Sequence, residues 1–212
     1  MSTHLYLLRH AQTADTSKFH GSESDIGLSD WGHGQARRLA KRFAQTPIDA
    51  IYSSAMRRAV DTATPIASAL GLVLHQVPAL HERSMGELAG ASRDEFRHVF
   101  TDAMIAWMAG DLNFTHPTGE SYKAMRRRGV PALTEILDRN DGRKVLVVAH
   151  GMLIRVLISS LVPEWPVSKL SEIKIDNCAT NEFVWEGGSL KPIRLCDLPE
   201  DLVNPPDDKP FW

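Results

Sequence analysis

The chain has 212 residues and a formal net charge of −2, with 43% of its residues hydrophobic and 24% charged. This composition is typical of a soluble globular protein with a sizeable core, and the near-neutral charge argues against binding to nucleic acid or to an anionic membrane. Two cysteines are too few for a disulfide framework, no apolar run approaches the ~20 residues of a membrane span, and no signal-like apolar segment follows residues 1–4. We therefore expect a reduced, soluble, cytoplasmic protein.

The chain opens on an apolar strand that ends in polar side chains. The run Leu5–Leu8 predicts a buried strand, and Arg9 and His10 follow it directly. Taken alone, this pattern slightly favours a strand that simply meets solvent. Ser29 or Asp30 is expected to cap the first helix. The elements predicted in this half are a loop over 14–30, a helix over 36–43, a strand over 50–52, a helix over 59–70 and a strand over 72–77.

The second half alternates helices with one strong strand before a hairpin. A capping box of Ser92 and Glu95 predicts a helical stretch that runs toward Ala109. Pro131 predicts a kink or a break in a long helix. The run Lys144–Ala149 is the strongest strand signal, and we expect that strand to be central and parallel. The other predicted elements are loops over 79–91 and 110–117, helices over 120–138 and 152–161, hairpin strands over 183–185 and 190–195, and a surface tail from residue 197.

This alternation of strands and helices predicts one α/β domain over residues 1–212. The triplet Arg126–Arg128 in the long helix is the only basic cluster. We interpret it as a solvated helix face, with a rim that attracts anionic substrates as the alternative.

Three strand ends carry residues suited to binding a doubly charged anion. They are Arg9 and His10 after the first strand, Arg58 after the second, and His150 with Gly151 after the strand over 144–149. Ligands bind beyond the C-terminal ends of strands in open α/β sheets, so we expect these residues to share one site. The arginine fork binds phosphate oxygens bidentately, and amides at the helix starts after Ser54 and Gly151 would add to the positive field. A neutral imidazole there can attack phosphorus and form a covalent phosphohistidine.

Phosphoryl transfer also needs a proton for the leaving alkoxide. Glu82 is the best candidate, because its loop follows a strand expected to end at the same edge. An exposed loop acid is an equally supported interpretation of Glu82. His81 has no partner at metal-ligand spacing, and neither a cysteine pair nor a His-Glu-x-x-His pattern occurs, so no metal site is expected. The remaining histidines are interpreted as surface or core residues, with His20 as the strongest exception.

Five motifs follow one another along the chain. They are Leu8–Thr13 (LRHAQT), Ser53–Ala63 (SSAMRRAVDTA), Leu80–Arg83 (LHER) with Gly86, Gly119–Ser121 (GES) and Val148–Gly151 (VAHG). In this order they resemble the phosphoglycerate mutase-like branch of the histidine phosphatase superfamily, and the resemblance extends to the hairpin around Gly187. It implies a single-domain, three-layer α/β/α sandwich with a mostly parallel central sheet, a small cap insertion at about 83–117, and a C-terminal hairpin and tail at about 173–212.

The resemblance also implies a role for each site residue. His10 becomes the phosphorylated nucleophile, with Arg9, Arg58 and His150 around the phosphate. Glu82 becomes the proton donor and later the base that activates water. The other residues expected to bind substrate are Gln12, Thr13, Thr16, Arg83 and Gly151. No metal and no organic cofactor is expected.

The chain departs from the frequent pattern of that family at three places. Ala11 replaces a common glycine, and Gly27 replaces a common proline. Asp15 and Thr16 replace a frequent Trp-Asn pair whose asparagine helps to hold the phosphate. The hydroxyl of Thr16 is the expected substitute for that contact.

The segment between the acid and the Gly-Glu-Ser motif favours hydrolysis over phosphoryl transfer. Residues 90–118 form a shorter span than the corresponding insertion in the mutases, so we expect a phosphatase that acts on a small phosphorylated metabolite. Phosphoglycerate mutase-type transfer is the first alternative. A catalytically weak phosphate-binding regulatory protein is the second, although none of its expected losses (nucleophile, acid or second histidine) occurs. Residues 14–26 and 83–117 are expected to set specificity, and the sequence is compatible with a monomer or a homodimer.

Overall fold

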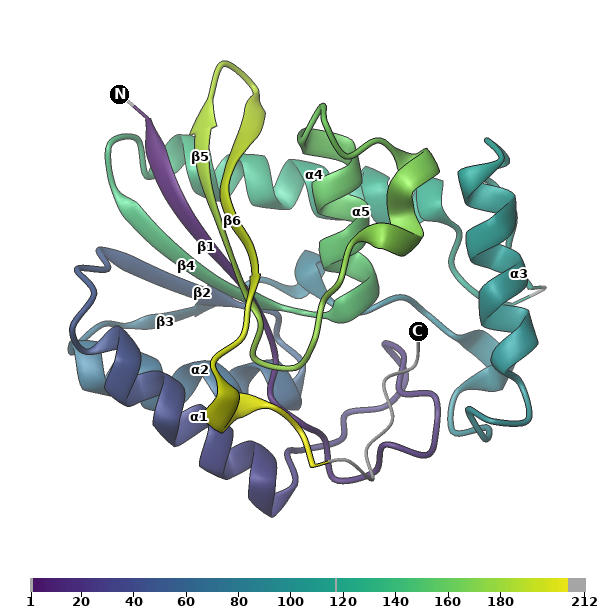
Figure 1. Cartoon of the computed structure of the whole chain (residues 1–212), viewed down its shortest axis with the longest axis horizontal. Helices are drawn as coiled ribbons and strands as arrows, with labels where there is room; N and C mark the ends of the chain where they lie inside the picture. Colours follow the sequence, from purple (N-terminus) through teal and green to yellow (C-terminus); the bar gives the residue numbers. More distant parts are fainter. Residues whose placement is uncertain (1, 117, 206–212) are drawn as a thin grey trace.

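A computed structural model describes residues 2–116 and 118–205 and contains one mixed, six-stranded sheet (Figure 1). The strand order is β3-β2-β4-β1-β5-β6, in which the first four strands are parallel and the last two run antiparallel to β1 and to each other. The strands are β1 Thr3–Arg9, β2 Ala50–Ser53, β3 Leu74–Gln76, β4 Lys144–Ala149, β5 Thr180–Glu186 and β6 Ser189–Asp197. The helices are α1 Asp30–Phe43, α2 Arg57–Leu70, α3 Arg97–Met108, α4 Tyr122–Arg139 and α5 Gly151–Leu161, with short 3-10 turns η1 Pro78–Leu80, η2 Gly86–Leu88, η3 Val167–Glu172 and η4 Glu200–Leu202. The mostly parallel α/β sheet is confirmed.

Helices cover both faces of the sheet and make it the middle of three layers. Alternate side chains of β4 point to opposite faces: Val145 and Val147 pack with the α4–α5 layer, whereas Leu146 and Val148 pack with the α1–α2 layer. All four are fully buried, as expected for a parallel strand covered on both sides. Figure 1 shows α3 outside these layers, on the other side of α5 from the strands. The predicted three-layer sandwich is therefore confirmed.

The parallel strands deliver their C-terminal ends to one edge. Arg9 is paired with Ala149 in the β1–β4 register, and Ser53 of β2 lies opposite Val148 of β4. The residues that follow these strands therefore meet at this edge. The predicted central, parallel position of β4 is confirmed, because β4 lies between β1 and β2.

Helix α4 runs through Pro131 as one helix, so of the predicted kink or break the break does not occur. A proline removes one backbone donor, which leaves the carbonyl of the residue four positions earlier without a helical partner. That residue, Arg127, is exposed, so water can satisfy the carbonyl. Gly129 serves a packing purpose, because a Cβ there would lie 2.7 Å from Leu153 Cδ1 of α5.

The helix of the cap begins later than the capping box predicted. Ser92 forms an isolated bridge with Lys18, which holds it in extended structure, and the chain then turns until α3 begins at Arg97. The Ser92 hydroxyl accepts only a long contact from the Glu95 amide, at 3.4 Å. By contrast, Ser29 caps α1 as predicted and accepts from the Gly32 amide at 2.9 Å. The predicted loop end Pro117 lies outside the described residues.

The first part of the C-terminal tail is packed against the core. Leu202 of η4 is fully buried, and its carbonyl accepts from Gln35 Nε2 of α1 at 2.5 Å. Arg42 of α1 bonds to Asp201. The predicted surface course of residues 206–212 lies outside the described residues. Within the described ranges, no helix is both long and apolar enough to cross a bilayer.

Candidate active site

A pocket opens beyond the C-terminal edge of the sheet. Loop residues 15–20 supply one wall and cap residues 83–100 another. The two walls are joined, because Phe19 N donates to the Ala91 carbonyl at 3.0 Å and Gly90 N donates to the Phe19 carbonyl at 2.9 Å. The lining residues are Arg9, His10, Thr13, Asp15, Lys18, Phe19, His20, Arg58, Glu82, Arg83, Met85, Arg93, Phe100, Gly151 and Met152. Residues from all three strand ends singled out in the sequence, Arg9 with His10, Arg58, and Gly151, therefore line one pocket, whereas His150 is not among the lining residues.

His10 is a neutral imidazole with its lone pair on Nε2. Its side chain is nearly buried, with 6% exposure, and Nδ1 lies 2.7 Å from the Ala11 carbonyl. A carbonyl only accepts, so Nδ1 carries the proton and Nε2 carries the lone pair. Burial, followed by the nearby charges of Arg58 and Arg9, holds the pKa of His10 well below 6.5. At neutral pH the ring therefore has a free lone pair, which a nucleophile requires.

His150 has the opposite tautomer. Arg58 Nε donates to His150 Nδ1 at 3.2 Å, and because an arginine never accepts, the proton of His150 sits on Nε2. That Nε2–H group is buried and has no hydrogen-bond partner among the described residues. The two imidazole rings are 5.2 Å apart between centroids. His150 thus offers a neutral donor beside His10, and burial keeps its pKa well below 6.5.

Arg58 is a buried cation that also organises the neighbouring loop. Its terminal nitrogens donate to the carbonyls of Ser24, His20 and Gly21, at 2.9, 3.2 and 3.4 Å. Burial lowers its pKa to about 10, so it remains charged at neutral pH. Arg9 donates to the Ile175 carbonyl at 2.7 Å and also lines the pocket. Two fixed positive charges therefore flank His10.

Glu82 is held by the start of helix α5. Its carboxylate accepts from the amides of Met152 at 3.1 Å and Leu153 at 3.2 Å, and from its own neighbour Arg83 at 2.8 Å. It also lines the pocket, so the interpretation as an exposed loop acid is wrong. The helix-start amides were expected to add positive charge to the anion site, and here the structure differs. The α5 amides bond to Glu82, and the Arg57 amide at the start of α2 bonds to Asp25 at 2.7 Å.

Arg83 is a buried cation in the pocket wall. It is 1% exposed, and its guanidinium lies over the Trp107 ring at 4.7 Å from the centroid. Nε donates to the Glu120 carbonyl at 2.9 Å, whereas both terminal nitrogens are buried without a partner among the described residues. Burial lowers its pKa to about 10, which still leaves it charged. A buried cation with unused donors favours an anionic ligand group.

The other predicted binding residues divide between the pocket and its surroundings. Thr13 and Gly151 line the pocket. Gln12 is not among the lining residues, and its side-chain oxygen accepts from the Ser29 hydroxyl at 2.5 Å. Thr16 does not line it either, and its carbonyl accepts from Arg93 at 2.7 Å. The neighbouring Asp15 lines the pocket instead.

The sequence did not identify two basic residues of the pocket wall, Lys18 and Arg93. Lys18 comes from the loop over 14–30 and Arg93 from the cap, both within segments expected to set specificity. Their charge and location were the available signals. His20, the strongest exception among the remaining histidines, does line the pocket.

The triplet on α4 is not one solvated face. Arg126 and Arg127 are exposed as predicted, but Arg128 is turned inward and has a side-chain exposure of 17%. It bonds to Glu120 and to backbone carbonyls of the loop that carries Glu82. The prediction therefore fails at Arg128.

Acid is expected to destabilise the fold through the two buried imidazoles. In the unfolded chain His10 and His150 would titrate near 6.5, whereas in the folded protein both pKa values lie well below that value. Between these limits the unfolded chain binds more protons, so the free energy of unfolding falls as pH falls, by up to ~1.4 kcal/mol per pH unit for each histidine. Urea unfolding between about pH 7 and pH 5.5 measures this slope. A His150→Gln variant is expected to lose roughly half of it, and an unchanged slope would contradict the assignment.

Comparisons with known proteins agree with this geometry. The family model described as Histidine phosphatase superfamily (branch 1) matches residues 5–197. A relative from Hydrogenobacter thermophilus, named "Putative phosphoserine phosphatase 2", is 33% identical over 185 residues, which cover 86% of this chain and 90% of the relative. "Probable phosphoglycerate mutase GpmB" from Yersinia pestis is 32% identical over 187 residues, covering 86% of this chain and 85% of that protein. The native structure of a mycobacterial glucosyl-3-phosphoglycerate phosphatase matches with a TM-score of 0.79 at 26% identity, over 92% of this chain and 99% of that chain. With His10, Arg9 and Arg58 lining one pocket, His150 beside His10, and a family match over nearly its whole length, this chain belongs to the histidine phosphatase superfamily, branch 1.

Proposed function

We propose that this protein is a phosphoric monoester hydrolase that works through a phosphohistidine on His10. The observation that carries the proposal is the pair of complementary imidazoles. His10 presents a lone pair on Nε2, His150 presents a buried N–H, and the charges of Arg9 and Arg58 lie beside them. A nucleophile, a neutral donor and fixed cations are the groups that transfer of a phosphoryl dianion requires.

The first chemical step transfers the phosphoryl group to the enzyme. A bond forms between His10 Nε2 and phosphorus while the bond from phosphorus to the ester oxygen breaks. Glu82 passes a proton to that oxygen, which leaves as an alcohol. Arg9, Arg58 and the His150 N–H group stabilise charge on the phosphoryl oxygens.

The second step returns the enzyme to its starting state. Water attacks phosphorus, Glu82 accepts a proton from the water, and the bond between phosphorus and Nε2 breaks. Inorganic phosphate leaves, and His10 is again neutral. Because Glu82 is held at the start of α5 in reach of the pocket, one carboxylate serves both steps.

We propose that the substrate is a small phosphomonoester with a second anionic group, such as a carboxylate. Arg83 supports this, because it is buried and charged and has unused donors in the pocket wall. Lys18 and Arg93 add positive charge to the same pocket. The relative named a phosphoserine phosphatase agrees with this class, since phosphoserine carries a carboxylate.

Mutase-type transfer is the second candidate, and the relative named a phosphoglycerate mutase is the observation that favours it. Trace 2,3-bisphosphoglycerate would activate an interconversion of phosphoglycerates in that case. Regulatory phosphate binding without turnover is less well supported, because His10, Glu82 and His150 are all present and face or flank one pocket.

A matched pair of substrates tests both the function and the substrate class. Glycerol 3-phosphate and 3-phosphoglycerate differ only in a hydroxymethyl group and a carboxylate. We expect wild-type protein to release phosphate from both and to have at least about tenfold higher kcat/KM for the carboxylate, which corresponds to ~1.4 kcal/mol of extra transition-state binding. Arg83→Met is expected to abolish this preference, and Arg97→Met, an exposed cap substitution, to keep it.

Two outcomes would contradict the proposal. Absence of phosphate release from every small ester would refute the phosphatase, and a carboxylate preference that survives Arg83→Met would refute the role of Arg83.

We further propose that the enzyme needs no metal and works in the cytoplasm. No group of three or more His, Cys, Asp or Glu side chains in the described part of the chain is arranged to hold a metal ion, and both cysteines are free thiols. Activity that requires added metal after chelation would contradict the first part.

A further inference from the structure

Arg128 of α4 does not line the pocket, and its guanidinium bonds to Glu120 and to the loop that carries Glu82. Nε donates to Glu120 Oε1 and Nη2 to Glu120 Oε2, both at 2.7 Å. Nη1 donates to the carbonyls of Ala79 and His81, both at 2.8 Å, and Nη2 donates to the Glu82 carbonyl at 3.1 Å. Arginine has five N–H groups, so all of them have acceptors here. A lysine, with three donors on one atom, cannot reproduce this set.

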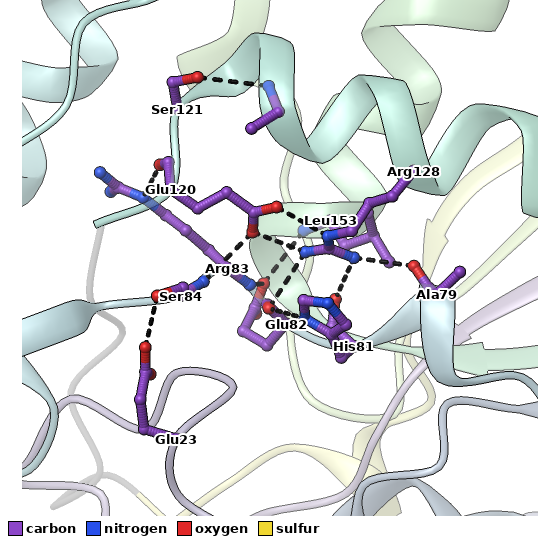
Figure 2. A network of polar contacts seen from close by, with 11 residues as sticks. Glu23, Ala79, His81, Glu82, Arg83, Ser84, Glu120, Ser121, Arg128 and Leu153 are labelled. Carbon is purple, nitrogen blue, oxygen red and sulfur yellow. Dashed lines mark hydrogen bonds and ion pairs between the residues drawn. The ribbon is translucent and has the colours of Figure 1, made fainter. Parts of the chain in front are cut away.

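Glu120 connects Arg128 to the next two residues of the acid loop. Its Oε2 also accepts from the Ser84 amide at 3.2 Å. Its backbone accepts from Arg83 Nε and donates to the Ser84 carbonyl, both at 2.9 Å. Figure 2 shows Glu120 and Arg128 facing each other with the segment from His81 to Ser84 beside them. The Glu120 side chain is 12% exposed, so this ion pair is largely shielded from water.

The segment that these two residues hold has no regular structure of its own. Residues 81–85 lie between the 3-10 turns η1 and η2, so no helix or strand fixes their backbone. Within this segment Glu82 points to the start of α5 and Arg83 to the pocket wall. Buried irregular backbone depends on side-chain partners for its carbonyls and amides. Arg128 and Glu120 supply partners for the carbonyls of His81, Glu82 and Ser84 and for the Ser84 amide.

We propose that Glu120 and Arg128 are positioning residues that set the geometry of Glu82 and Arg83 without touching the substrate. This inference rests on the proposed function. Removal of Arg128 takes one donor from each of the Ala79, His81 and Glu82 carbonyls and two from the Glu120 carboxylate, which keeps only the Ser84 amide. The Glu82 loop is therefore expected to shift while His10, Arg9, Arg58 and His150 keep their own contacts. The expected consequence is loss of proton transfer and of second-anion binding, with the nucleophile intact.

Three substrates separate these effects. The nitrophenolate of p-nitrophenyl phosphate leaves without a proton, so its kcat/KM, which covers only the steps up to leaving-group release, does not need Glu82. Glycerol 3-phosphate needs the proton, and 3-phosphoglycerate needs both the proton and a partner for its carboxylate. For Arg128→Met we expect kcat/KM to change by less than about threefold on the nitrophenyl ester, to fall about 30-fold on glycerol 3-phosphate, and to fall further on 3-phosphoglycerate.

Control variants make the result specific. Arg127→Met removes the adjacent, exposed arginine of the same helix and is expected to match wild type on all three esters. Glu120→Gln is expected to show the same substrate order as Arg128→Met, because each Glu120 oxygen accepts from N–H groups and the amide must turn an NH2 toward one of them. Arg128→Lys is expected to fall between wild type and Arg128→Met.

The outcomes are distinguishable from failure of the proposed function. Equal losses on all three esters, in soluble variants with wild-type circular dichroism, would show a merely structural ion pair and overturn the inference. If Arg128→Met does not fold, Glu120→Gln and Arg128→Lys give the same comparison. Absence of turnover by wild-type protein on all three esters would instead refute the phosphatase itself.

Discussion

His10→Ala is expected to abolish phosphate release, with a loss of at least about 10⁴-fold in kcat for every ester that the wild type hydrolyses. The reason is chemical rather than steric. His10 lines the pocket with a lone pair on Nε2, because its Nδ1 proton is bonded to the Ala11 carbonyl, and burial beside Arg58 and Arg9 keeps it unprotonated. Alanine removes the atom that must bond to phosphorus while the cations that bind phosphate stay in place.

The measurement should follow the intermediate as well as the product. Wild-type protein quenched during turnover is expected to carry an acid-labile, base-stable phosphoryl group, and His10→Ala none. The exposed His33 of α1 offers a matched control, since His33→Ala removes an imidazole that does not line the pocket. Phosphate release by His10→Ala at the wild-type rate, or a labelled intermediate that persists in it, would sink the mechanism.

Glu82→Gln is expected to lower kcat/KM on alkyl phosphates by about 10² to 10⁴-fold, because the leaving alkoxide loses its proton donor. The same variant is expected to retain kcat/KM on p-nitrophenyl phosphate within about tenfold. Glu82 accepts from three backbone amides, and glutamine can offer only one oxygen to them, so part of the loss reflects a shifted side chain.

Rapid mixing separates the two steps of this variant. With the nitrophenyl ester, Glu82→Gln is expected to give a burst of nitrophenolate close to one equivalent of enzyme and then slow turnover, since no base activates water. Phosphoenzyme should accumulate during the slow phase. A uniform loss on alkyl and aryl esters without a burst would assign Glu82 to structure instead of proton transfer.

The strand ends of the site were predictable from the sequence because local pattern determines them. Uninterrupted apolar runs such as Lys144–Ala149 occur where a parallel strand is covered on both faces, and parallel strands must end at one edge. The residues directly after them, His10 and His150, were therefore placed together correctly. The loop after a strand made Glu82 the best candidate for the acid, but the pattern left an exposed acid equally supported, and only the resemblance implied its role.

What the sequence did not predict depends on contacts between distant segments. Arg128 follows Arg126 and Arg127 in the same helix, and nothing local distinguishes it from them. It is shielded from water only because residues 79–84 and Glu120 pack against it. The delayed start of α3 has the same origin, because the bridge from Lys18 holds Ser92 outside the helix. Pattern also favoured a kink or a break at Pro131, yet α4 continues through it.

The hydrogen bonds between Ser84 and Glu120 have a consequence for how such enzymes diversify. They join the two points at which the chain leaves the sheet-bearing core and re-enters it, with 2.9 Å between Glu120 N and the Ser84 carbonyl. The segment between those two points is an insertion whose ends are held together. Lengthening a closed loop costs little, ~0.6 kcal/mol for each doubling. The core can therefore accept insertions of other lengths and sequences while the end of β1 that carries His10 is left untouched.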